Sequence, residues 1–422
     1  MTELARRSLL AGAAALAVAA PRRPSLPAAP SVVIAGAGFA GATCAKYLRK
    51  YAPGIAVTLV DRNPIHVACP GSNEVLVGLK RIQDLQRNVS SMARGRGVSF
   101  VQGEIASIDP ARRSIRLSNG QTLAGDALVV APGIGFRWGA VQGYTQATES
   151  TLPHAWIAGP QTETLSRRLQ GLPANPTVIV TVPRAPYRCP PAPYERASLI
   201  AWYLAKSGKR GRVLILDAND SFPKQAVFEE VWRTLYPGAV QRVPASQDGE
   251  VVAIDAANRI ARTRTQSYQG HLLNVIPPQQ AGPLAQAAGL TDNTGWCPVD
   301  PRTFESNRVS GVWVIGDSAL TNLPRSAAAG MGAAKVAAAA IATRLVGRAA
   351  DEPLIINTCY STVAKGQAIG IVTVFGLQGS QFAARNGATG TTPVGAGAGY
   401  WREEYEDAVG WWRNMLADAF NP

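Results

Sequence analysis

Residues 31–41 read Ser-Val-Val-Ile-Ala-Gly-Ala-Gly-Phe-Ala-Gly, an apolar run that passes directly into three glycines spaced Gly-x-Gly-x-x-Gly. The apolar run predicts a buried parallel strand, and residues 42–49 predict a helix after it. In this context Gly36 permits a tight turn, Gly38 lets the backbone approach a pyrophosphate, and Gly41 lets helix and strand pack closely. The helix N-terminus adds N–H donors and partial positive charge for the phosphates. The stretch therefore predicts a dinucleotide-binding βαβ unit.

An acidic residue at the end of the next predicted strand completes this pattern. Residues 56–60 predict that strand, and Asp61 follows it, twenty residues after Gly41. A carboxylate at this position accepts hydrogen bonds from ribose hydroxyls. The predicted dinucleotide contacts in this unit are Gly36, Gly38, Phe39, Ala40, Gly41, Asp61 and Arg62.

Two later turns favour FAD over NAD. Residues 127–130 predict a strand that ends in the turn Ala131-Pro132-Gly133, and residues 311–315 predict a strand that ends in Gly316-Asp317. A strand ending in Gly-Asp before an Ala- and Gly-rich helix resembles the second flavin fingerprint of flavoproteins with two dinucleotide-binding domains. That resemblance implies that Asp317 binds the ribityl chain, and Lys335 in the helix could offset negative charge on the reduced ring. The alternative is an ordinary strand-to-helix turn with an aspartate cap.

A second Rossmann-like unit begins with the strand predicted over residues 177–182. The loop after it, residues 183–191, reads Pro-Arg-Ala-Pro-Tyr-Arg-Cys-Pro-Pro and contains no glycine. Proline has no backbone N–H, so this loop cannot line a phosphate with amides as a nucleotide loop does. The fold continues with a helix predicted over residues 194–205 and a strand over residues 212–217. We therefore expect a NAD-type unit that does not bind NAD(P)H.

The C-terminal region has a different pattern. An apolar stretch over residues 369–377 precedes a Gly-, Ala- and Thr-rich segment, residues 379–399, which predicts a loop or flexible connector. Residues 400–420 carry apolar side chains near helical spacing. This helix is acidic and so poorly suited to an anionic membrane surface. We expect it to pack on the protein, with Trp411 or Trp412 closing the flavin pocket or serving only as core.

Together these elements predict an α/β fold with two Rossmann-like, dinucleotide-binding-type domains, each a three-layer parallel-sheet domain, plus a C-terminal α+β domain. A chain of 422 residues is long enough for two or three domains. The predicted boundaries are residues 31–142 with 284–346 for the FAD-binding domain, 143–283 for the NAD-type domain and 347–422 for the C-terminal domain. Residues 1–30 are predicted to be an export signal and linker.

The N-terminus has the features of an export signal. Arg6 and Arg7 precede an Ala-, Leu- and Val-rich run that continues to Ala20, and Ala17-Val18-Ala19 fits a small-residue cleavage site. Paired arginines indicate the twin-arginine route, which exports folded, cofactor-loaded proteins. We therefore expect a periplasmic protein, in a compartment where disulfides persist. The alternative is a basic disordered tail.

Composition excludes several classes of function. The 42 Lys and Arg and 28 Asp and Glu residues give a net charge of +14, and 46% apolar residues indicate a globular chain. Three histidines and the lack of any Cys-x-x-Cys pair argue against a metal site. The lack of Cys-x-x-Cys-His means that any haem must belong to another chain. No nucleic-acid partner is expected, and the hydropathy pattern excludes a polytopic membrane protein.

The five cysteines occur in distinct contexts. Cys69 lies in the loop after the second predicted strand, Cys189 lies in the glycine-free loop, and Cys359 lies beyond the last predicted FAD-domain helix. Cys44, in the first helix, and Cys297 are most simply small packing residues. Because five is an odd number, at least one cysteine is not in an internal disulfide.

Several segments resemble the flavoprotein subunit of flavocytochrome c–sulfide dehydrogenase, a relative of the sulfide:quinone oxidoreductases, and the resemblance extends over nearly the whole chain after residue 31. The segments that carry it are Cys69 with Ser72-Asn73-Glu74-Val75, Cys189-Pro190-Pro191 with Pro193-Tyr194-Glu195-Arg196-Ala197, Ile276-Pro277-Pro278-Gln279, Trp296-Cys297-Pro298-Val299-Asp300, and Asn357-Thr358-Cys359-Tyr360-Ser361. This chain departs from the family at Pro70-Gly71, where larger residues are usual.

The resemblance implies roles for three cysteines. Cys69 would be bonded covalently to the 8α-methyl group of FAD, with Asn73 among the flavin contacts. Cys189 and Cys359 would form a redox-active disulfide over the flavin ring, with Cys359 nearer the flavin and Cys189 more open to substrate. A small c-type cytochrome subunit would take the electrons. Without the resemblance, a purely structural disulfide between Cys189 and Cys359 would be the simpler interpretation.

Elementary sulfur chemistry agrees with these roles. A disulfide is a natural electrophile for sulfide, a small soft nucleophile, and attack gives a cysteine persulfide and a thiolate that can pass two electrons to a flavin. Glu195, six residues after Cys189, is a candidate acid/base for the thiols; its alternative role is a helix-dipole contact in the first turn of its helix. We therefore predict a sulfide dehydrogenase that works with a cytochrome. The alternatives are a sulfide:quinone reductase at the membrane and a non-catalytic subunit with a structural flavin.

Overall fold

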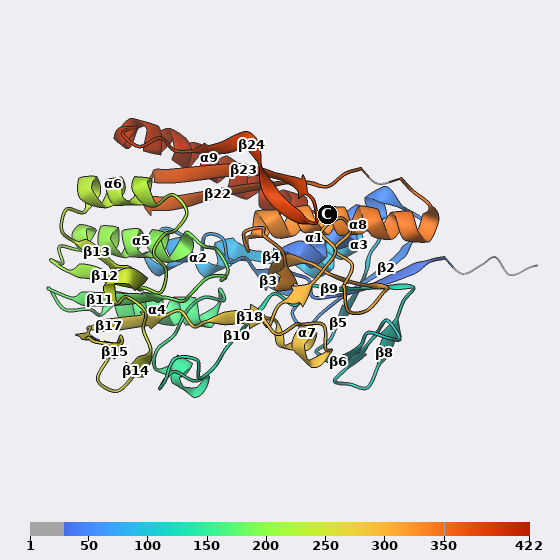
Figure 1. Ribbon diagram of the computed structural model, residues 1–422, viewed down its shortest axis with the longest axis horizontal. Coiled ribbons are helices and arrows are strands. Elements are labelled where there is room, and N and C mark those ends of the chain that lie inside the picture. Colours follow the sequence, from blue (N-terminus) through green and yellow to red (C-terminus); the bar gives the residue numbers. More distant parts are fainter. Residues whose placement is uncertain (1–28, 350) are drawn as a thin grey trace, which may run out of the picture.

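The computed structural model describes residues 29–349 and 351–422 of the chain. Two α/β units lie side by side, and a C-terminal layer extends across both of them (Figure 1). The expected export signal lies outside the described residues, so it stays a prediction.

The first unit is built on a five-stranded parallel sheet. Its strands, in spatial order, are β20 (Val312–Val314), β9 (Ala127–Val130), β1 (Ser31–Ala35), β2 (Ala56–Asp61) and β5 (Ser99–Gln102). Helix α1 (Phe39–Tyr51) connects β1 to β2 and packs beside α8 (Ala327–Val346). Because the strands are parallel, the loops at their carboxyl ends meet at one edge of the sheet. This edge therefore brings the glycine-rich turn and Gly316-Asp317 together.

The second unit is built on a four-stranded parallel sheet. Its strands, in spatial order, are β13 (Val240–Val243), β12 (Arg212–Asp217), β11 (Thr177–Val182) and β17 (Leu272–Val275). Helices α5 (Ala192–Lys206) and α6 (Gln225–Leu235) connect these strands. The glycine-free loop, residues 183–191, follows β11 at the carboxyl edge of the sheet, where a NAD-binding unit has its nucleotide loop.

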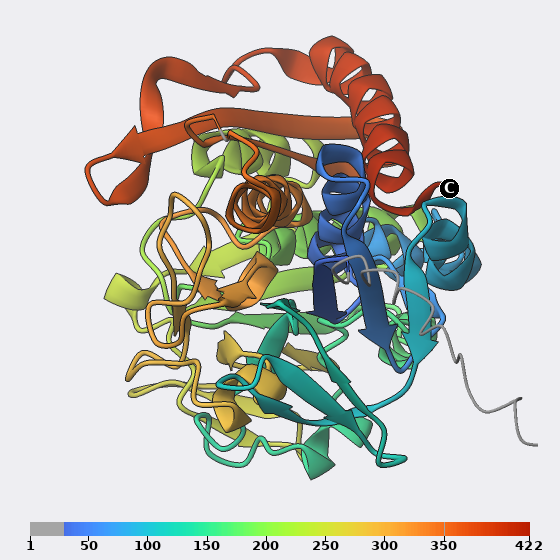
Figure 2. The ribbon, with the colours of Figure 1, turned by 90° about the vertical axis from the view of Figure 1, so that its right-hand side faces the viewer.

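The C-terminal layer is an antiparallel sheet and one long helix. Strands β22 (Leu354–Ala364), β23 (Gln367–Gln378) and β24 (Gln381–Thr391) pair in sequence order. Strand β22 lies against α5 and α8, and helix α9 (Gly397–Phe420) packs against β23, β22 and α1. Figure 2 shows this layer in red above α8 and α1. The sheet therefore joins the two α/β units.

The segment of residues 379–399 was predicted to be a loop, and this prediction is wrong. Strand β24 occupies residues 381–391 and pairs with β23 through a two-residue hairpin in which Gly379 has a φ of +62°. Backbone pairing with β23 outweighs the weak strand propensity of its Ala, Gly and Asn residues. The Gly379-Ser380 pair between the two strands was the available hairpin signal.

Short elements complete the fold. The helices are α2 (Ser72–Leu76), α3 (Val89–Gly95), α4 (Pro160–Gln170) and α7 (Pro283–Ala287). The strands are β3 (Ile65–Val67), β4 (Gln86–Asn88), β6 (Ile105–Asp109), β7 (Ser114–Leu117), β8 (Thr122–Ala124), β10 (Ile134–Phe136), β14 (Ala253–Asp255), β15 (Ile260–Arg262), β16 (Ser267–Gln269), β18 (Gln279–Ala281), β19 (Cys297–Pro298) and β21 (Ala319–Leu320). Two parallel-sheet units with a C-terminal sheet and helix confirm the predicted α/β fold class.

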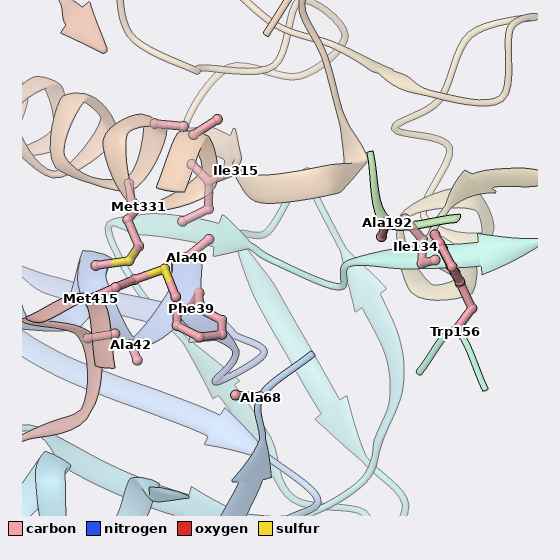
Figure 3. Close-up of a cluster of buried hydrophobic side chains, with 14 of the residues drawn as sticks. Phe39, Ala40, Ala42, Ala68, Ile134, Trp156, Ala192, Ile315, Met331 and Met415 are labelled. Carbon is pink, nitrogen blue, oxygen red and sulfur yellow. The ribbon is translucent and has the colours of Figure 1, made fainter. Parts of the chain in front are cut away.

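The core is continuous between α1, α8 and α9. Phe39 of α1, Met331 of α8 and Met415 of α9 lie together in this core (Figure 3). Among the described helices, α8 is long and apolar enough to cross a membrane by length and composition alone. Half of that window is buried inside the protein, so packing against α1 and β22 accounts for its apolar composition.

Candidate active site

The glycine-rich turn between β1 and α1 has the shape of a phosphate cradle. Gly36 has a φ of +102°, and a Cβ there would lie 2.4 Å from the carbonyl oxygen of Ala131. A Cβ at Gly41 would lie 1.8 Å from the carbonyl oxygen of Gly36. A Cβ at Gly38 would meet only a ring carbon of His66, at 3.7 Å. Packing therefore requires the two outer glycines, and the middle glycine keeps the N-terminus of α1 open to a ligand.

Asp61 holds this turn in place. One carboxylate oxygen accepts a hydrogen bond from the N–H of Ala37 (2.8 Å), and the other accepts one from the N–H of Asn63 (2.9 Å). Asp61 thus lies beside the cradle, where a ribose contact requires a carboxylate. Arg62 is exposed, and its guanidinium lies 3.6 Å from Glu104 in a surface ion pair.

The turn after β9 borders the same cradle. The N–H of Ala131 donates to the carbonyl of Ala35 (2.8 Å), and the carbonyl of Gly133 accepts from the N–H of Gly282 (2.9 Å). Gly133 has a φ of +67°, a conformation that glycine adopts at little cost. These bonds fix Ala131, Pro132 and Gly133 beside the carboxyl end of β1.

Phe39 and Ala40 are packing residues at the start of α1. The ring of Phe39 meets the rings of His66 and Phe420 edge-on, with centroids 5.6 Å and 5.0 Å away. A Cβ at Gly316 would lie 3.1 Å from the Cβ of Ala40. Both residues therefore position α1 against its neighbours at the predicted cofactor site.

The Gly316-Asp317 turn borders a polar hollow at the N-terminus of α8. The hollow is open to solvent, and its lining includes Asp317, Arg325 and Ser326. The Oγ of Ser326 caps α8 by accepting a hydrogen bond from the N–H of Ala329 (3.0 Å). Burial raises the pKa of Asp317, and the positive charges of Arg188 and Arg325 oppose this shift. The hollow thus combines hydrogen-bonding groups with the positive end of a helix dipole.

Arg325 contributes a donor that lacks a partner. Its side chain is 7% exposed, its guanidinium stacks 3.7 Å from the centre of the Trp296 ring, and its Nε donates to the carbonyl of Asp317 (3.1 Å). Its Nη2 is buried and has no hydrogen-bond partner within the described residues. An unpaired buried donor is costly, and an acceptor on a ligand in the hollow would satisfy it. The cradle, Asp61 and this hollow together fit FAD.

Lys335, which was expected to offset charge on the flavin ring, contacts α9 and α1, and its role toward the flavin stays a prediction. Its Nζ lies 2.9 Å from Asp418 of α9 and 4.8 Å from the centre of the Tyr47 ring of α1. Lys335 is more than two helical turns beyond the N-terminus of α8, on the face that packs against α1 and α9. The positive charge of Lys335 therefore stabilises the packing of α8 against α1 and α9.

Cys69 lies in a loop between β3 and α2 that α9 supports. The carbonyl of Cys69 accepts from the N–H of Ser72 (3.0 Å), and Nε1 of Trp412 donates to the carbonyl of Pro70 (3.3 Å). Gly71 has a φ of +89°, and a Cβ there would lie 3.4 Å from Nε1 of Trp412. Pro70 and Gly71, where the family usually has larger residues, are therefore the residues of this loop that pack closely against Trp412.

Cys189 and Cys359 meet although 170 positions separate them. Cys189 lies in the loop between β11 and α5, Cys359 lies on β22, and both are unpaired thiols in hydrogen-bonding contact. Cys189 has a φ of +55°, which is strained for a residue with a Cβ, and its N–H donates to the carbonyl of Arg325 (2.7 Å). The Oγ of Ser326 donates to Oδ1 of Asn357 on β22 (2.6 Å). Both sulfur-bearing segments are thus tied to the hollow at α8.

The two thiols differ in acidity. A hydrogen bond from Cys189 and the positive charge of Lys224 lower the pKa of Cys359 to about 6, although burial opposes this shift. The same hydrogen bond, together with burial, raises the pKa of Cys189 well above its usual value. The directions of the two pKa shifts make Cys359 the more acidic thiol of the pair.

Glu195 lies in the first turn of α5, close to the sulfur pair. Burial raises the pKa of Glu195 to about 8, and the negative charges of Glu74 and Cys359 add to the shift. Lys224 and a hydrogen bond with Asn73 oppose it. A carboxyl group with a pKa near 8 can release and regain a proton near neutral pH. The position of Glu195 therefore suits an acid/base for the thiols.

Arg196 organises a buried polar network beneath these residues. Its guanidinium donates to Oδ1 of Asn73 (2.9 Å), Oδ1 of Asn274 (2.8 Å) and the carbonyls of His154 and Ala155 (2.8 Å each). The side chain is 1% exposed. Arg196 therefore fixes Asn73 in the place from which it contacts Glu195.

Several of these residues were not singled out from the sequence. Glu74 and Arg196 lie inside the segments that carry the family resemblance, and that position was a usable signal. Lys224, in Phe222-Pro223-Lys224-Gln225, had no such signal.

Trp411 and Trp412 lie beside residues next to Cys359 and Cys69. The Trp411 ring packs 5.7 Å from that of Tyr360, the residue after Cys359, and Trp412 contacts the loop of Cys69. The remaining two cysteines lie in the core. Cys44 and Cys297 are both fully buried, and burial raises the pKa of each thiol.

Three family models match the chain. Pyridine nucleotide-disulphide oxidoreductase matches residues 30–156, and the central part of the sulfide dehydrogenase (flavocytochrome c) flavoprotein chain matches residues 162–277. Flavocytochrome c sulphide dehydrogenase, flavin-binding, matches residues 351–420. These matches cover parts of the first α/β unit, most of the second and the C-terminal layer; residues 278–350, with β20 and α8, lie outside them.

Similar proteins agree with the family models. Mitochondrial sulfide:quinone oxidoreductase of Mus musculus is 24% identical over 324 residues, which are 72% of this chain and 68% of that protein. A flavoprotein chain of sulfide dehydrogenase (flavocytochrome c) from Chlorobaculum thiosulfatiphilum is 57% identical over 44 residues, which are 10% of this chain and 92% of that sequence. The crystal structure of sulfide:quinone oxidoreductase from Aquifex aeolicus has the same fold, with a TM-score of 0.71, 17% identity and 93% of each chain covered.

The fold, the FAD cradle and these matches define an FAD-dependent oxidoreductase of the sulfide-oxidising group of flavin disulfide reductases. Within that class, the chain belongs to the family of flavocytochrome c sulfide dehydrogenase flavoprotein chains, which is related to the sulfide:quinone oxidoreductases. The resemblance found in the sequence is thereby confirmed.

Proposed function

We propose that this protein is the flavoprotein of a periplasmic sulfide dehydrogenase that oxidises sulfide at Cys189 and Cys359 and passes the electrons through FAD to a c-type cytochrome. The observation that carries the proposal is the meeting of two distant thiols beside Glu195 and Lys224, at the edge of a site that fits FAD.

The first chemical step is a thiol–disulfide exchange. In the oxidised protein Cys189 and Cys359 form a disulfide, and HS⁻ bonds to the sulfur of Cys189. The disulfide bond breaks, and its electron pair stays on Cys359 as a thiolate, so the negative charge brought in by HS⁻ is conserved. When bound, FAD supplies an acceptor for this electron pair and can release the electrons singly.

Glu195 would accept and then release the proton of the persulfide. The carboxylate would take the proton from the Cys189 persulfide and release it to solvent. The outer sulfur would leave as zero-valent sulfur when the pair returns to the disulfide state, and FAD, when bound, would be the two-electron acceptor. A pKa of about 8 permits both proton transfers near neutral pH.

Covalent attachment of FAD through Cys69 is part of the proposal. The support is the position of Cys69 in a loop braced by Trp412, in a segment that matches the family. Denatured, acid-treated protein should keep flavin fluorescence on its polypeptide band, and Cys69→Ser should lose it. Cys44→Ala, which changes a core cysteine, is the matched control and should keep it. Release of free flavin by denatured wild-type protein would contradict the covalent bond.

The electron acceptor has two candidates. A c-type cytochrome is supported by the family of the chain and by the exposed acidic residues Glu403, Glu406 and Asp407 of α9, which suit a membrane surface poorly. Quinone reduction is supported by the likeness to sulfide:quinone oxidoreductases and by two exposed apolar side chains on β22, Leu354 (54% exposed) and Ile356 (59% exposed).

Acceptor assays distinguish the two candidates and test the activity itself. Sulfide should bleach the flavin, and NADH should not. The reduced protein should then reduce a c-type cytochrome faster than decylubiquinone. Faster quinone reduction would replace the cytochrome with a quinone, and no bleaching by sulfide would leave a non-catalytic flavoprotein.

The location of the protein can be tested through Arg6 and Arg7. Cell fractionation should find the wild-type protein in the periplasm. A double Arg6→Lys and Arg7→Lys variant should accumulate in the cytoplasm. Equal periplasmic recovery of both proteins would contradict twin-arginine export.

A further inference from the structure

Lys224 is a buried cation that contacts the backbone of Cys359. It immediately precedes α6, has a φ of +65°, and its side chain is 7% exposed. Its Nζ donates to Oγ of Ser361 (2.8 Å), the carbonyl of Ile369 (3.1 Å) and the carbonyl of Cys359 (3.3 Å). The three N–H donors of the ammonium are therefore matched by three oxygens of β22 and β23.

All three acceptors are uncharged. Within the described part of the chain, carboxylates pair with Lys46, Lys80 and Lys335, and none pairs directly with Lys224. A buried charge without a direct counter-ion is costly unless another charge lies nearby. The hydrogen bonds satisfy the donors of Lys224 but leave its positive charge uncompensated.

The groups that can compensate this charge are those of the sulfur site. Burial lowers the pKa of Lys224, and negative charge on Cys359, Glu195, Cys189 and Glu404 opposes that shift. These are the titratable groups facing the ammonium from β22, α5, the loop before α5 and α9. Lys224 in turn lowers the pKa of Cys359. The ammonium and the Cys359 sulfur are therefore coupled in both directions.

We propose that Lys224 is the positioning residue of the sulfur chemistry: its fixed ammonium makes Cys359 the sulfur released as a thiolate, and so directs incoming sulfide to Cys189. This inference rests on the proposed function. The better thiolate leaves faster in thiol–disulfide exchange. When HS⁻ bonds to Cys189, the electron pair of the broken S–S bond develops on Cys359, next to the cation. Attack on Cys359 would instead place the thiolate on Cys189, the less acidic sulfur.

The acidity of Cys359 is the first test. We would reduce the full-length protein with a phosphine and follow alkylation of Cys359 by iodoacetamide from pH 5 to pH 9, using peptide mass spectrometry. Lys224→Met should slow this alkylation about tenfold at pH 6.5, because only the thiolate reacts. Lys224→Arg, which keeps the charge, should stay within about twofold of wild type.

Ser361→Ala is the matched control, because it removes one hydrogen bond from Nζ and no charge. If Lys224 only fastened α6 to the sheet, Ser361→Ala and Lys224→Met would change alkylation alike, and the inference would fail. If Lys224→Met does not fold, the Arg variant still decides: a folded Lys224→Arg protein with ordinary thiol acidity at Cys359 also overturns the inference.

The site of persulfide formation is the second test. Oxidised protein is mixed briefly with sulfide and alkylated, and the peptides are analysed. Wild-type protein should carry the persulfide on Cys189, and Lys224→Met should shift a share of it to Cys359. Persulfide mainly on Cys359 in the wild type would overturn this inference while leaving sulfide oxidation intact. Persulfide on neither cysteine would overturn the proposed function, and the inference with it.

Discussion

Replacing Glu195 by glutamine should stabilise the protein at alkaline pH. The native pKa of Glu195 is about 8, whereas the usual value is near 4.5. Between these two pH values the native state holds a proton that the unfolded state has released, so stability falls as pH rises. The slope is about 1.4 kcal/mol per pH unit, and the accumulated cost above pH 8 is about 5 kcal/mol. Glutamine cannot ionise, so Glu195→Gln lacks this cost.

The expected difference depends on pH and on the redox state of the sulfur pair. At pH 4.5 the variant and the wild type should unfold with similar free energies, and at pH 8 the variant should be more stable by several kcal/mol. The Cys359 thiolate contributes to the pKa shift of Glu195. A disulfide carries no charge, so the gap should be smaller in oxidised protein than in phosphine-reduced protein.

Urea unfolding followed by tryptophan fluorescence at pH 5, 6, 7 and 8 would measure this difference. Glu403→Gln is the control, because Glu403 is exposed on α9. The control should keep the pH slope of the wild type. Parallel stability curves for wild type and Glu195→Gln across this pH range would refute the claim that Glu195 is a partly buried acid with a raised pKa.

Two further changes probe the contacts that hold the site together. Burial alone would raise the pKa of Asp418, but Lys46 and Lys335 lower it below its usual value. Asp418→Asn should therefore reduce the free energy of unfolding by about 1–2 kcal/mol above pH 5. This difference should fade below pH 4, because the wild-type carboxylate becomes protonated there. An undiminished difference at pH 3 would contradict this. Arg196→Lys should cost about 2–4 kcal/mol in urea unfolding, because a single ammonium cannot donate to all four oxygens that the guanidinium satisfies. A cost below about 0.5 kcal/mol would show that the network relaxes.

The fold was largely predictable where local signals and topology agree. The run of residues 31–41 specifies a strand, a turn and a helix within eleven positions, and the structure has β1 and α1 there. Parallel strands then bring Gly316-Asp317 to the same edge, because their carboxyl ends align. Strand β24 was missed because its pairing with β23, rather than its own composition, makes it a strand.

The site was less predictable, because its geometry comes from contacts between distant segments. Lys224 meets β22 and β23 across 135 to 145 positions of the chain, and no local pattern marks such a lysine. The sequence predicted that Lys335 lies in a helix, but it did not predict which neighbouring element the Lys335 side chain faces. Its pairing with Asp418 depends on where α9 docks, which the sequence does not encode locally.

Sulfide-driven flavin reduction in Cys189→Ser and Cys359→Ser tests the central claim most directly. Anaerobic stopped-flow absorbance near 450 nm would follow bleaching of the flavin in each variant and in the wild type, with dithionite as the control that the flavin remains reducible. We predict rapid bleaching by sulfide in the wild type, loss of this bleaching in both variants, and full bleaching by dithionite in all three. Rapid bleaching by sulfide in either serine variant would contradict the sulfur-pair mechanism.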